Sequence, residues 1–162
     1  MKTLAIDCRM IQASGIGTYL RNLLPGVIAR CPDIAFRLLG NTQELATYPW
    51  TRNGRISIVP YDAPIYSITE QMAIFRALPG SVDALWSPHY NIPIGYRGVL
   101  IVTVHDVLHL AMPQYVHVFH RRIYAKTLFA FVSRNADRII CDSQFTAVEL
   151  MRFTSAAADK IR

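Results

Sequence analysis

Short, continuous apolar runs alternate with helical patterns along the whole sequence, and this alternation limits the possible folds more than any other feature. Strand-length apolar runs lie at 3–8, 35–40, 56–59, 84–87, 99–104 and 138–141. Helical patterns lie at 19–28, 68–78, 119–132 and 143–153. Strands that are apolar throughout belong to a sheet covered on both faces, and strands that alternate with helices form parallel βαβ units. The sequence therefore predicts an α/β fold, an open and mostly parallel sheet with helices on both faces.

Prolines bear on two of the helical patterns. Pro25 lies inside the first pattern, so we expect a kink or an early stop there. Pro79-Gly80 follows the second pattern and is expected to end that helix.

The composition of the 162-residue chain is that of a globular domain. Hydrophobic residues make up 52% and charged residues 17%, which excludes a disordered chain. The three cysteines, Cys8, Cys31 and Cys141, form no CxxC pair, which excludes a disulfide scaffold and favours a cytoplasmic protein. No apolar stretch reaches the roughly 18–20 residues that span a bilayer. We expect 1–153 to form one domain and the polar segment 154–162 to begin an interdomain connection.

Polar residues follow the predicted strands at the points where open α/β sheets bind ligands, beyond the carboxyl ends of the strands. They are Asp7, Arg9 and the Gly15-Ile16-Gly17 loop after the first strand, His89 after the fourth, His105 and Asp106 after the fifth, and Asp142 and Ser143 after the sixth. This position makes them the candidates for a functional site.

The glycine loop allows two interpretations. Gly15 and Gly17 precede a helix, and two glycines let the backbone approach a phosphate, whose charge is favourable at a helix N-terminus. The alternative is a tight turn into a helix without a ligand. The dinucleotide-binding fingerprint needs a third glycine where this chain has Leu20. A nicotinamide-dependent oxidoreductase is therefore disfavoured, and no cofactor is expected.

His105 and Asp106 directly follow six apolar strand residues. A histidine in this place can hydrogen-bond a sugar hydroxyl or stabilise a phosphate, with Asp106 orienting it. The alternative is that Asp106 caps the following turn and His105 is an ordinary strand-end residue. Ser143 lacks a surrounding GxSxG motif, so helix capping is its favoured interpretation.

The other histidines predict no metal site. His109, His117 and His120 belong to no HExxH motif and have no zinc-type spacing to the cysteines. No metal is therefore expected.

The segment between Asp106 and Asp137 contains no acidic residue. The basic residues of the helix predicted there are Arg121, Arg122, Lys126 and Arg134. An acid-free amphipathic helix can dock on anionic lipid headgroups, so helix 119–134 is a candidate peripheral membrane contact. The alternative is an ordinary solvated helix face. No nucleic-acid-binding motif is present, so nucleic acid is not expected as a partner.

Four segments stand in order along the chain: IDCRMIQASGIGTYLRNLL, SPHYNIP, VLIVTVHDVLHLAMPQY and RNADRIICDSQFTAVEL. Together they resemble the N-terminal half of a retaining GT-B glycosyltransferase, in the group that includes bacterial mannosyltransferases and relatives of sucrose and glycogen synthases. The resemblance covers 3–152. It implies a Rossmann-like domain that mostly binds the acceptor. The facing C-terminal domain, which carries the E-x7-E motif and binds the nucleotide-sugar, is absent from this chain.

The resemblance also implies roles for the candidate residues. His105 would face the donor sugar near the reaction centre, with Asp106 beside it, and would position the sugar and stabilise developing charge. Gly15 and Gly17 would lie near the donor diphosphate. The residues expected to flank the cleft and the acceptor are Asp7, Arg9, His89 and Ser143. Enzymes of this family require no metal.

The implied function is transfer of a hexose from a nucleotide-sugar to a glycan or lipid-linked acceptor with retention of configuration, in surface polysaccharide or glycolipid synthesis. Mannose is among the candidate sugars, and this chain alone is expected to be inactive. We expect a cytoplasmic protein with a peripheral contact at the inner face of the cell membrane. The alternative is a free-standing α/β module that binds a phosphorylated ligand and catalyses no transfer.

Overall fold

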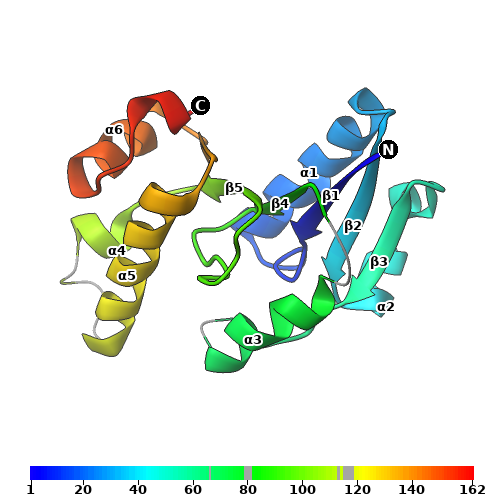
Figure 1. The fold of residues 1–162 in the computed structure, drawn as a ribbon, viewed down its shortest axis with the longest axis horizontal. Helices are drawn as coiled ribbons and strands as arrows, with labels where there is room; N and C mark the ends of the chain where they lie inside the picture. Colours follow the sequence, from blue (N-terminus) through cyan, green and yellow to red (C-terminus); the bar gives the residue numbers. More distant parts are fainter. Residues whose placement is uncertain (66, 79–81, 113, 115–118) are drawn as a thin grey trace. The chain divides into compact units, whose positions relative to one another are not determined.

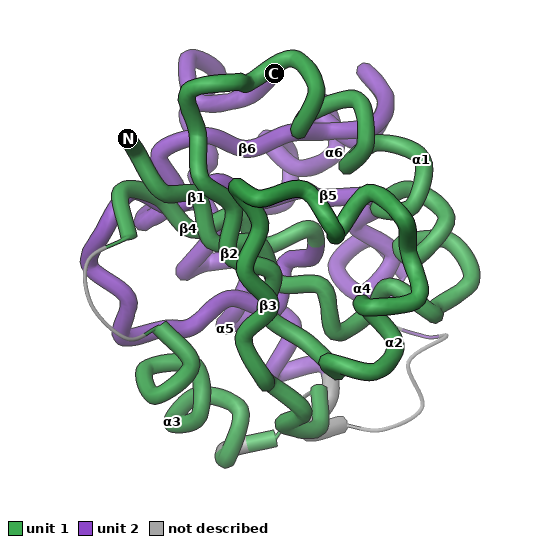
Figure 2. The backbone as a smooth tube through the Cα atoms, turned by 90° about the vertical axis from the view of Figure 1, so that its right-hand side faces the viewer, with its two compact units in different colours: residues 1–88 green, residues 89–162 purple. Residues whose placement is uncertain are grey.

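A computed structural model describes residues 1–65, 67–78, 82–112, 114 and 119–162, with only the backbone described for 68 and 119–121 (Figure 1). The expected helix stop at Pro79-Gly80, His117 and the side chain of His120 lie outside what is described. The chain forms two compact units, Met1–Pro88 and His89–Arg162, shown in different colours in Figure 2.

The first unit is built on four parallel strands. They are β1 (Lys2–Asp7), β2 (Ile34–Gly40), β3 (Ile56–Pro60) and β4 (Ala84–Ser87). Within this unit the strand order is β3-β2-β1-β4, and every pair is parallel. Consecutive residues are buried at the carboxyl ends of the strands, such as Leu38 and Leu39 on β2. Because neighbouring side chains on a strand point to opposite faces, both faces of this sheet are covered.

Among the described residues of the first unit, the helices are α1 (Gly15–Arg30), α2 (Thr42–Ala46), the 3-10 helix η1 (Pro49–Arg52) and α3 (Ile68–Ala77). The apolar stripe of α1 buries Leu20, Leu24 and Ile28, at the spacing of one helix face. The helix continues through Pro25 to Arg30, so an early stop at Pro25 is wrong.

The second unit contains the parallel strands β5 (Val99–Val104) and β6 (Arg138–Cys141). Its helices are α4 (Leu108–Ala111), α5 (Phe119–Asn135), α6 (Gln144–Phe153) and the 3-10 helix η3 (Ala158–Lys160). After η3, Ile161 makes a parallel bridge to Ile139 of β6. The core of this unit includes Val102 and Val104 of β5 and Leu128 and Val132 of α5, all fully buried.

The fold class predicted from the sequence is confirmed. Strands alternate with helices, all strand pairs among the described residues are parallel, and the architecture is an open Rossmann-like α/β sheet. Cys8, Cys31 and Cys141 are all free thiols, as the absence of a disulfide framework predicts. Across the described part of the chain, no helix combines the length and apolarity needed to cross a bilayer.

Candidate functional site

A histidine and a carboxylate meet at the carboxyl ends of the two strands of the second unit. The register of the sheet pairs Val104, the last residue of β5, with Cys141, the last residue of β6. The next residues along the two strands, His105 and Asp142, are therefore neighbours. Nδ1 of His105 donates a hydrogen bond to Oδ2 of Asp142. Their side chains are 19% and 37% exposed, so the pair is oriented by the fold and still accessible from solvent.

The start of α6 holds this pair in place. Ser143 is the N-cap, since its Oγ accepts a hydrogen bond of 3.1 Å from the backbone N–H of Thr146. Oγ1 of Thr146 in turn donates to the carbonyl of His105 at 3.1 Å. The expected capping role of Ser143 is confirmed, and the cap connects the end of β5 to the helix that follows β6.

Asp106 does not orient His105, because Nδ1 of His105 bonds to Asp142. Its Oδ1 accepts a hydrogen bond of 2.9 Å from the backbone N–H of Leu108, and its side chain is exposed. It therefore caps the turn into α4, which is the alternative that the sequence left open. The carboxylate that orients His105 comes from another strand end, 37 residues further along the chain.

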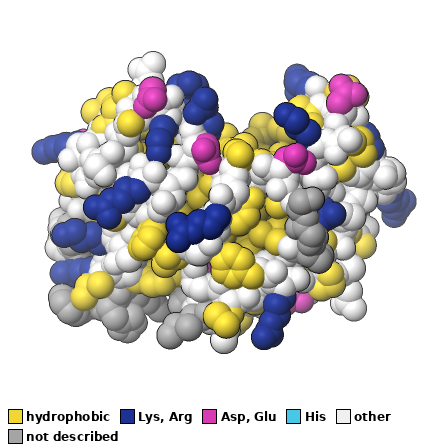
Figure 3. All heavy atoms as spheres, viewed as in Figure 1, with side chains coloured by type: hydrophobic (Ala, Val, Ile, Leu, Met, Phe, Trp, Pro, Cys, Tyr) yellow, Lys and Arg dark blue, Asp and Glu magenta, His cyan; other side chains and the backbone are white. Residues whose placement is uncertain are grey.

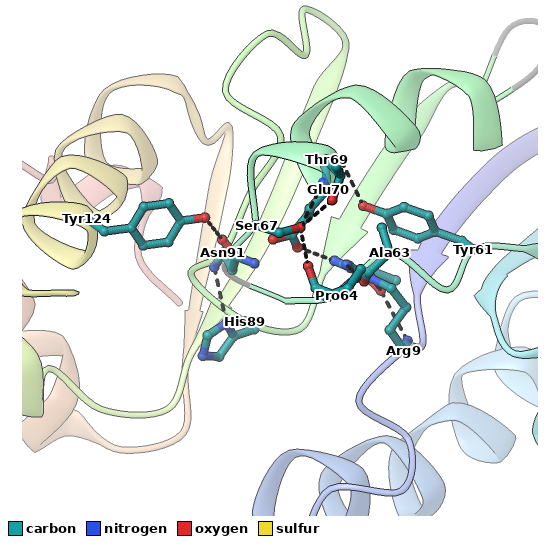
Figure 4. Close-up of polar contacts among 11 residues, drawn as sticks. Arg9, Tyr61, Ala63, Pro64, Ser67, Thr69, Glu70, His89, Asn91 and Tyr124 are labelled. Carbon is teal, nitrogen blue, oxygen red and sulfur yellow. Dashed lines mark hydrogen bonds and ion pairs between the residues drawn. The ribbon is translucent and has the colours of Figure 1, made fainter. Parts of the chain in front are cut away.

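Asp7 and Arg9 belong to a buried ionic cluster in the first unit. Figure 4 shows Arg9 with Glu70, Ala63 and Tyr61. Nη2 of Arg9 donates to Oδ2 of Asp7 at 2.6 Å and to Oε1 of Glu70 at 2.5 Å, and Nη1 donates to the carbonyl of Ala63 at 2.9 Å. The guanidinium also lies 4.1 Å from the ring centroid of Tyr61. The cluster therefore connects the end of β1, the loop after β3 and the start of α3.

The electrostatics of the cluster fix the charge of Arg9. Burial by itself lowers the pKa of Arg9, but the hydrogen bonds and charges of Asp7 and Glu70 outweigh burial and raise this pKa above its ordinary value. Only 7% of the Arg9 side chain is exposed. Arg9 is thus permanently charged. Its main role is to hold the end of β1 in place, and contact with a ligand anion would be secondary.

Glu70 was not among the residues that the sequence singled out. The pattern Ser67-x-x-Glu70 is a helix-start signal, and Ser67 does cap α3 by accepting a 3.1 Å hydrogen bond from the Glu70 N–H. In the sequence, helix capping alone is therefore enough to account for the glutamate at position 70. Its ion pair with Arg9, 61 positions earlier, depends on the packing of α3 and is invisible in the pattern.

Gly15 and Gly17, predicted to form a loop, lie in the first turn of α1, and they have different surroundings. A Cβ atom on Gly17 would lie 2.5 Å from the carbonyl oxygen of Ile11, which is too close for any side chain. Arg21 donates to the same carbonyl and to Oγ1 of Thr18. Gly17 therefore allows the first turn of α1 to pack closely against the backbone at Ile11. Gly15 has no atom within 4 Å of the corresponding position, so its environment is open enough for a ligand.

His89 lies in an aromatic and amide network of the second unit. Its ring centroid is 4.1 Å from that of Tyr90, and its Nδ1 accepts a 3.2 Å hydrogen bond from the backbone N–H of Asn91. Oδ1 of Asn91 accepts from the hydroxyl of Tyr124 at 2.8 Å, as Figure 4 shows. These contacts give His89 a structural role in shaping the loop after β4.

The structure thus brings four of the candidate residues into two groups, one in each unit, and leaves Asp106, His89, Gly15 and Gly17 outside both. Asp7 and Arg9 share the cluster of the first unit, and His105 and Ser143 share the strand ends of the second with Asp142. Within the described residues, His, Cys, Asp and Glu side chains form no group of the size that holds a metal ion.

Comparison with protein-family models finds no match for this chain. A search of curated proteins likewise finds no similar sequence. Function is therefore inferred from the residues themselves.

Proposed function

We propose that this chain is the acceptor-side domain of a retaining hexosyltransferase of the GT-B group. It would serve the transfer of a hexose from a nucleotide-sugar to a glycan or lipid-linked acceptor in the cytoplasm. The observation that supports this proposal most is the orientation of His105 by Asp142 at the carboxyl ends of β5 and β6. That is the edge where α/β sheets bind their ligands.

The chemistry of the pair suits glycosyl transfer. In a retaining transfer the bond between the sugar C1 and the donor diphosphate breaks, and the acceptor oxygen bonds to C1 on the same face. Positive charge develops on the sugar ring as the bond to the leaving group weakens. A carboxylate on Nδ1 fixes the tautomer and the ring plane of His105. The imidazole can then bond a sugar hydroxyl through its other nitrogen and stabilise the developing charge without forming a covalent bond.

Other parts of the chain have supporting roles in this proposal. The cluster of Asp7, Arg9 and Glu70 keeps the end of β1 rigid on the acceptor side. Gly15 would face the donor diphosphate, since space is open beside it. The nucleotide would be bound mostly by a second, facing domain. The basic side chains of α5, Lys126 and Arg134 among them, would bring the domain to an anionic membrane surface that presents a lipid-linked acceptor.

The test is an assay of nucleoside diphosphate release by the protein that carries this chain together with the sequence that follows Arg162 in its reading frame. UDP-glucose, UDP-galactose, UDP-N-acetylglucosamine and GDP-mannose would be offered separately. One of these donors should be consumed. His105→Ala should lower kcat by about 100-fold or more, a typical loss for a group that acts at the reacting centre. Asp142→Asn should lower kcat by about tenfold with a smaller change in KM, because the carboxylate that fixes the orientation of the His105 ring is lost.

Asp159→Asn is the matched control, since it removes one exposed carboxylate of the same unit from η3, away from the strand ends. It should leave kcat unchanged. Consumption of none of the donors would overturn the transferase proposal. An unchanged kcat in His105→Ala, with a donor consumed, would remove His105 from the site.

A further inference from the structure

We propose that the second unit contains a binding site for an amphipathic phosphate, a molecule with an apolar chain and a single phosphate group. The site is a cavity of about 550 Å³ lined by α4, α5 and the residues at the end of α6. Its volume lies in the range of small-molecule sites. The proposal concerns binding by this unit alone and is independent of the proposed transfer activity.

One face of α5 forms a long wall of the cavity. Arg122, Lys126, Phe129 and Ser133 follow each other at intervals of four, three and four residues, so they share a helix face. At 1.5 Å per residue, this face is about 16 Å long. The cations lie at its N-terminal end, and Phe129 lies in the middle. On the other side of the cavity, Phe153 at the end of α6 adds apolar surface and is 39% exposed.

The charge of the cavity favours an anion. Lys126 is exposed and has no ion-pair partner within the described part of the chain. No Asp or Glu is among the described residues that line the cavity. The sequence also contains no acidic residue between Asp106 and Asp137. Lys and Arg side chains gather over the helices of this unit in Figure 3. An anion beside Lys126 would therefore meet attraction that no nearby carboxylate of α4 or α5 cancels.

A second observation at the cavity wall is the state of His109. Its Nδ1 is buried and has no hydrogen-bond partner among the described residues, while its ring packs against Tyr90 at a centroid distance of 5.8 Å. Because this nitrogen is inaccessible to solvent, a ligand in the cavity does not reach it, and His109 contributes its ring to the cavity wall.

The two halves of the cavity together define the ligand class. Inorganic phosphate would bond at the cationic end and leave the exposed part of Phe153 in water, while Phe129, which is 1% exposed, is already buried by the protein. An alcohol of the same chain length would cover the apolar wall and leave the charge of Lys126 unpaired. Only a molecule with both parts satisfies both ends of the cavity.

Isothermal titration calorimetry with octyl phosphate, octanol and inorganic phosphate tests the proposal. Octyl phosphate should bind at least about tenfold more tightly than either of the others. Lys126→Ala should weaken it by about tenfold through loss of the charge. Ala130→Trp should weaken it by a similar factor, because the indole would fill the cavity that Ala130 lines. Lys126→Ala removes an exposed side chain and should not affect folding. It therefore tests the proposal even if Ala130→Trp disturbs folding.

Arg138→Ala is the matched control, since Arg138 is an exposed cation of the same unit that lies on β6 and does not line the cavity. It should change the affinity by less than about twofold. Equal losses from Lys126→Ala and Arg138→Ala, or equal affinities for octyl phosphate and octanol, would overturn the site. Binding to phosphatidylcholine vesicles that contain phosphatidic acid, abolished by Ala130→Trp, assigns the site to a lipid phosphate. Binding of octyl phosphate without vesicle binding assigns it to a soluble one.

Discussion

At the scale of single residues, the first turn of α1 contains two glycines, Gly15 and Gly17, that look equivalent in the sequence but differ in their surroundings. A methyl group on Gly17 would meet the backbone oxygen of Ile11 at 2.5 Å, and backbone atoms cannot move aside cheaply. We expect Gly17→Ala to lower the free energy of unfolding by about 1–3 kcal/mol, the usual cost of overpacking. Urea unfolding followed by circular dichroism measures it.

Gly15→Ala is the internal control for that experiment. No atom lies within 4 Å of the added methyl, and Gly15 is the first residue of α1. Alanine restricts the unfolded chain more than glycine does, so the stability should stay the same or rise by about 0.4–1 kcal/mol. A similar loss in both variants would show that the close contact at Gly17 does not set its identity.

Arg9 offers a second prediction at this scale. Arg9→Ala would leave Asp7 and Glu70 as buried carboxylates without their shared cation. Breaking a buried ion pair from one side typically costs about 3–5 kcal/mol, so we expect a loss of that size in the free energy of unfolding. Arg52→Ala, which removes an exposed arginine of η1, should cost less than about 0.5 kcal/mol. A loss below 1 kcal/mol in Arg9→Ala would contradict the role of the cluster as the anchor of the β1 end.

At the scale of elements, the cap of α6 determines how firmly the strand ends of the second unit are held. Ser143→Ala would remove the acceptor of the Thr146 N–H and should lower the free energy of unfolding by about 1 kcal/mol. Ser14→Ala at the start of α1 is the control, because the Ser14 side chain makes no cap hydrogen bond. Thermal unfolding of both variants compares them. Equal stability of Ser143→Ala and the parent would contradict the capping role.

The regular elements could be predicted from the sequence because each of them carries its own pattern. The strands Ala84–Ser87, Val99–Val104 and Arg138–Cys141 lie where their apolar runs end in polar residues, and the observed bounds agree with the prediction. The short helices α2 and α4 were not predicted. A helix of four or five residues is too short to show a period.

The candidate site could be predicted only in part, for a related reason. The position of His105 follows from one strand end, which a single segment reveals. Its partner depends on the register between β5 and β6, which pairs Val104 with Cys141 and so places Asp142 beside His105. Register is set by packing between segments, and the adjacent Asp106 was the more obvious partner in the sequence.

At the scale of the whole molecule, the +6 net charge is concentrated where acidic residues are missing. The interval between Asp106 and Asp137 includes α4 and α5, which also line the proposed phosphate site. Membrane binding and phosphate binding would therefore both depend on the positive electrostatic field of this interval. Added salt should weaken both. It should weaken membrane binding at the exposed helix face more, because charges in a partly enclosed cavity are screened less.

The response of the molecule to alkaline pH is a prediction that involves both units. Burial raises the pKa of Cys8 and of Tyr96 above their ordinary values, with added contributions from Asp7 and Asp137 respectively. Burial and the neighbouring Asp142 raise the pKa of Cys141 to about 11 from an ordinary value of 9.0. In the unfolded chain these groups lose their protons at lower pH than in the folded one. The folded state then holds more protons, so the free energy of unfolding falls as the pH rises.

For Cys141 the fall should begin near pH 9, where the unfolded thiol ionises, and end near pH 11, where the folded thiol ionises. Urea unfolding at intervals from about pH 8 to pH 11 measures it. Cys141→Ala should make the decline shallower, relative to its own stability near pH 8, because the variant has no thiol to ionise. Thr47→Ala, a substitution without a titrating group at an exposed position, should keep the parent slope. Lysine ionisation is common to all three proteins and cancels in the comparison. An identical slope in Cys141→Ala and the parent would mean that the end of β6 does not shield this thiol, and the environment assigned to its neighbour Asp142 would then have to be revised.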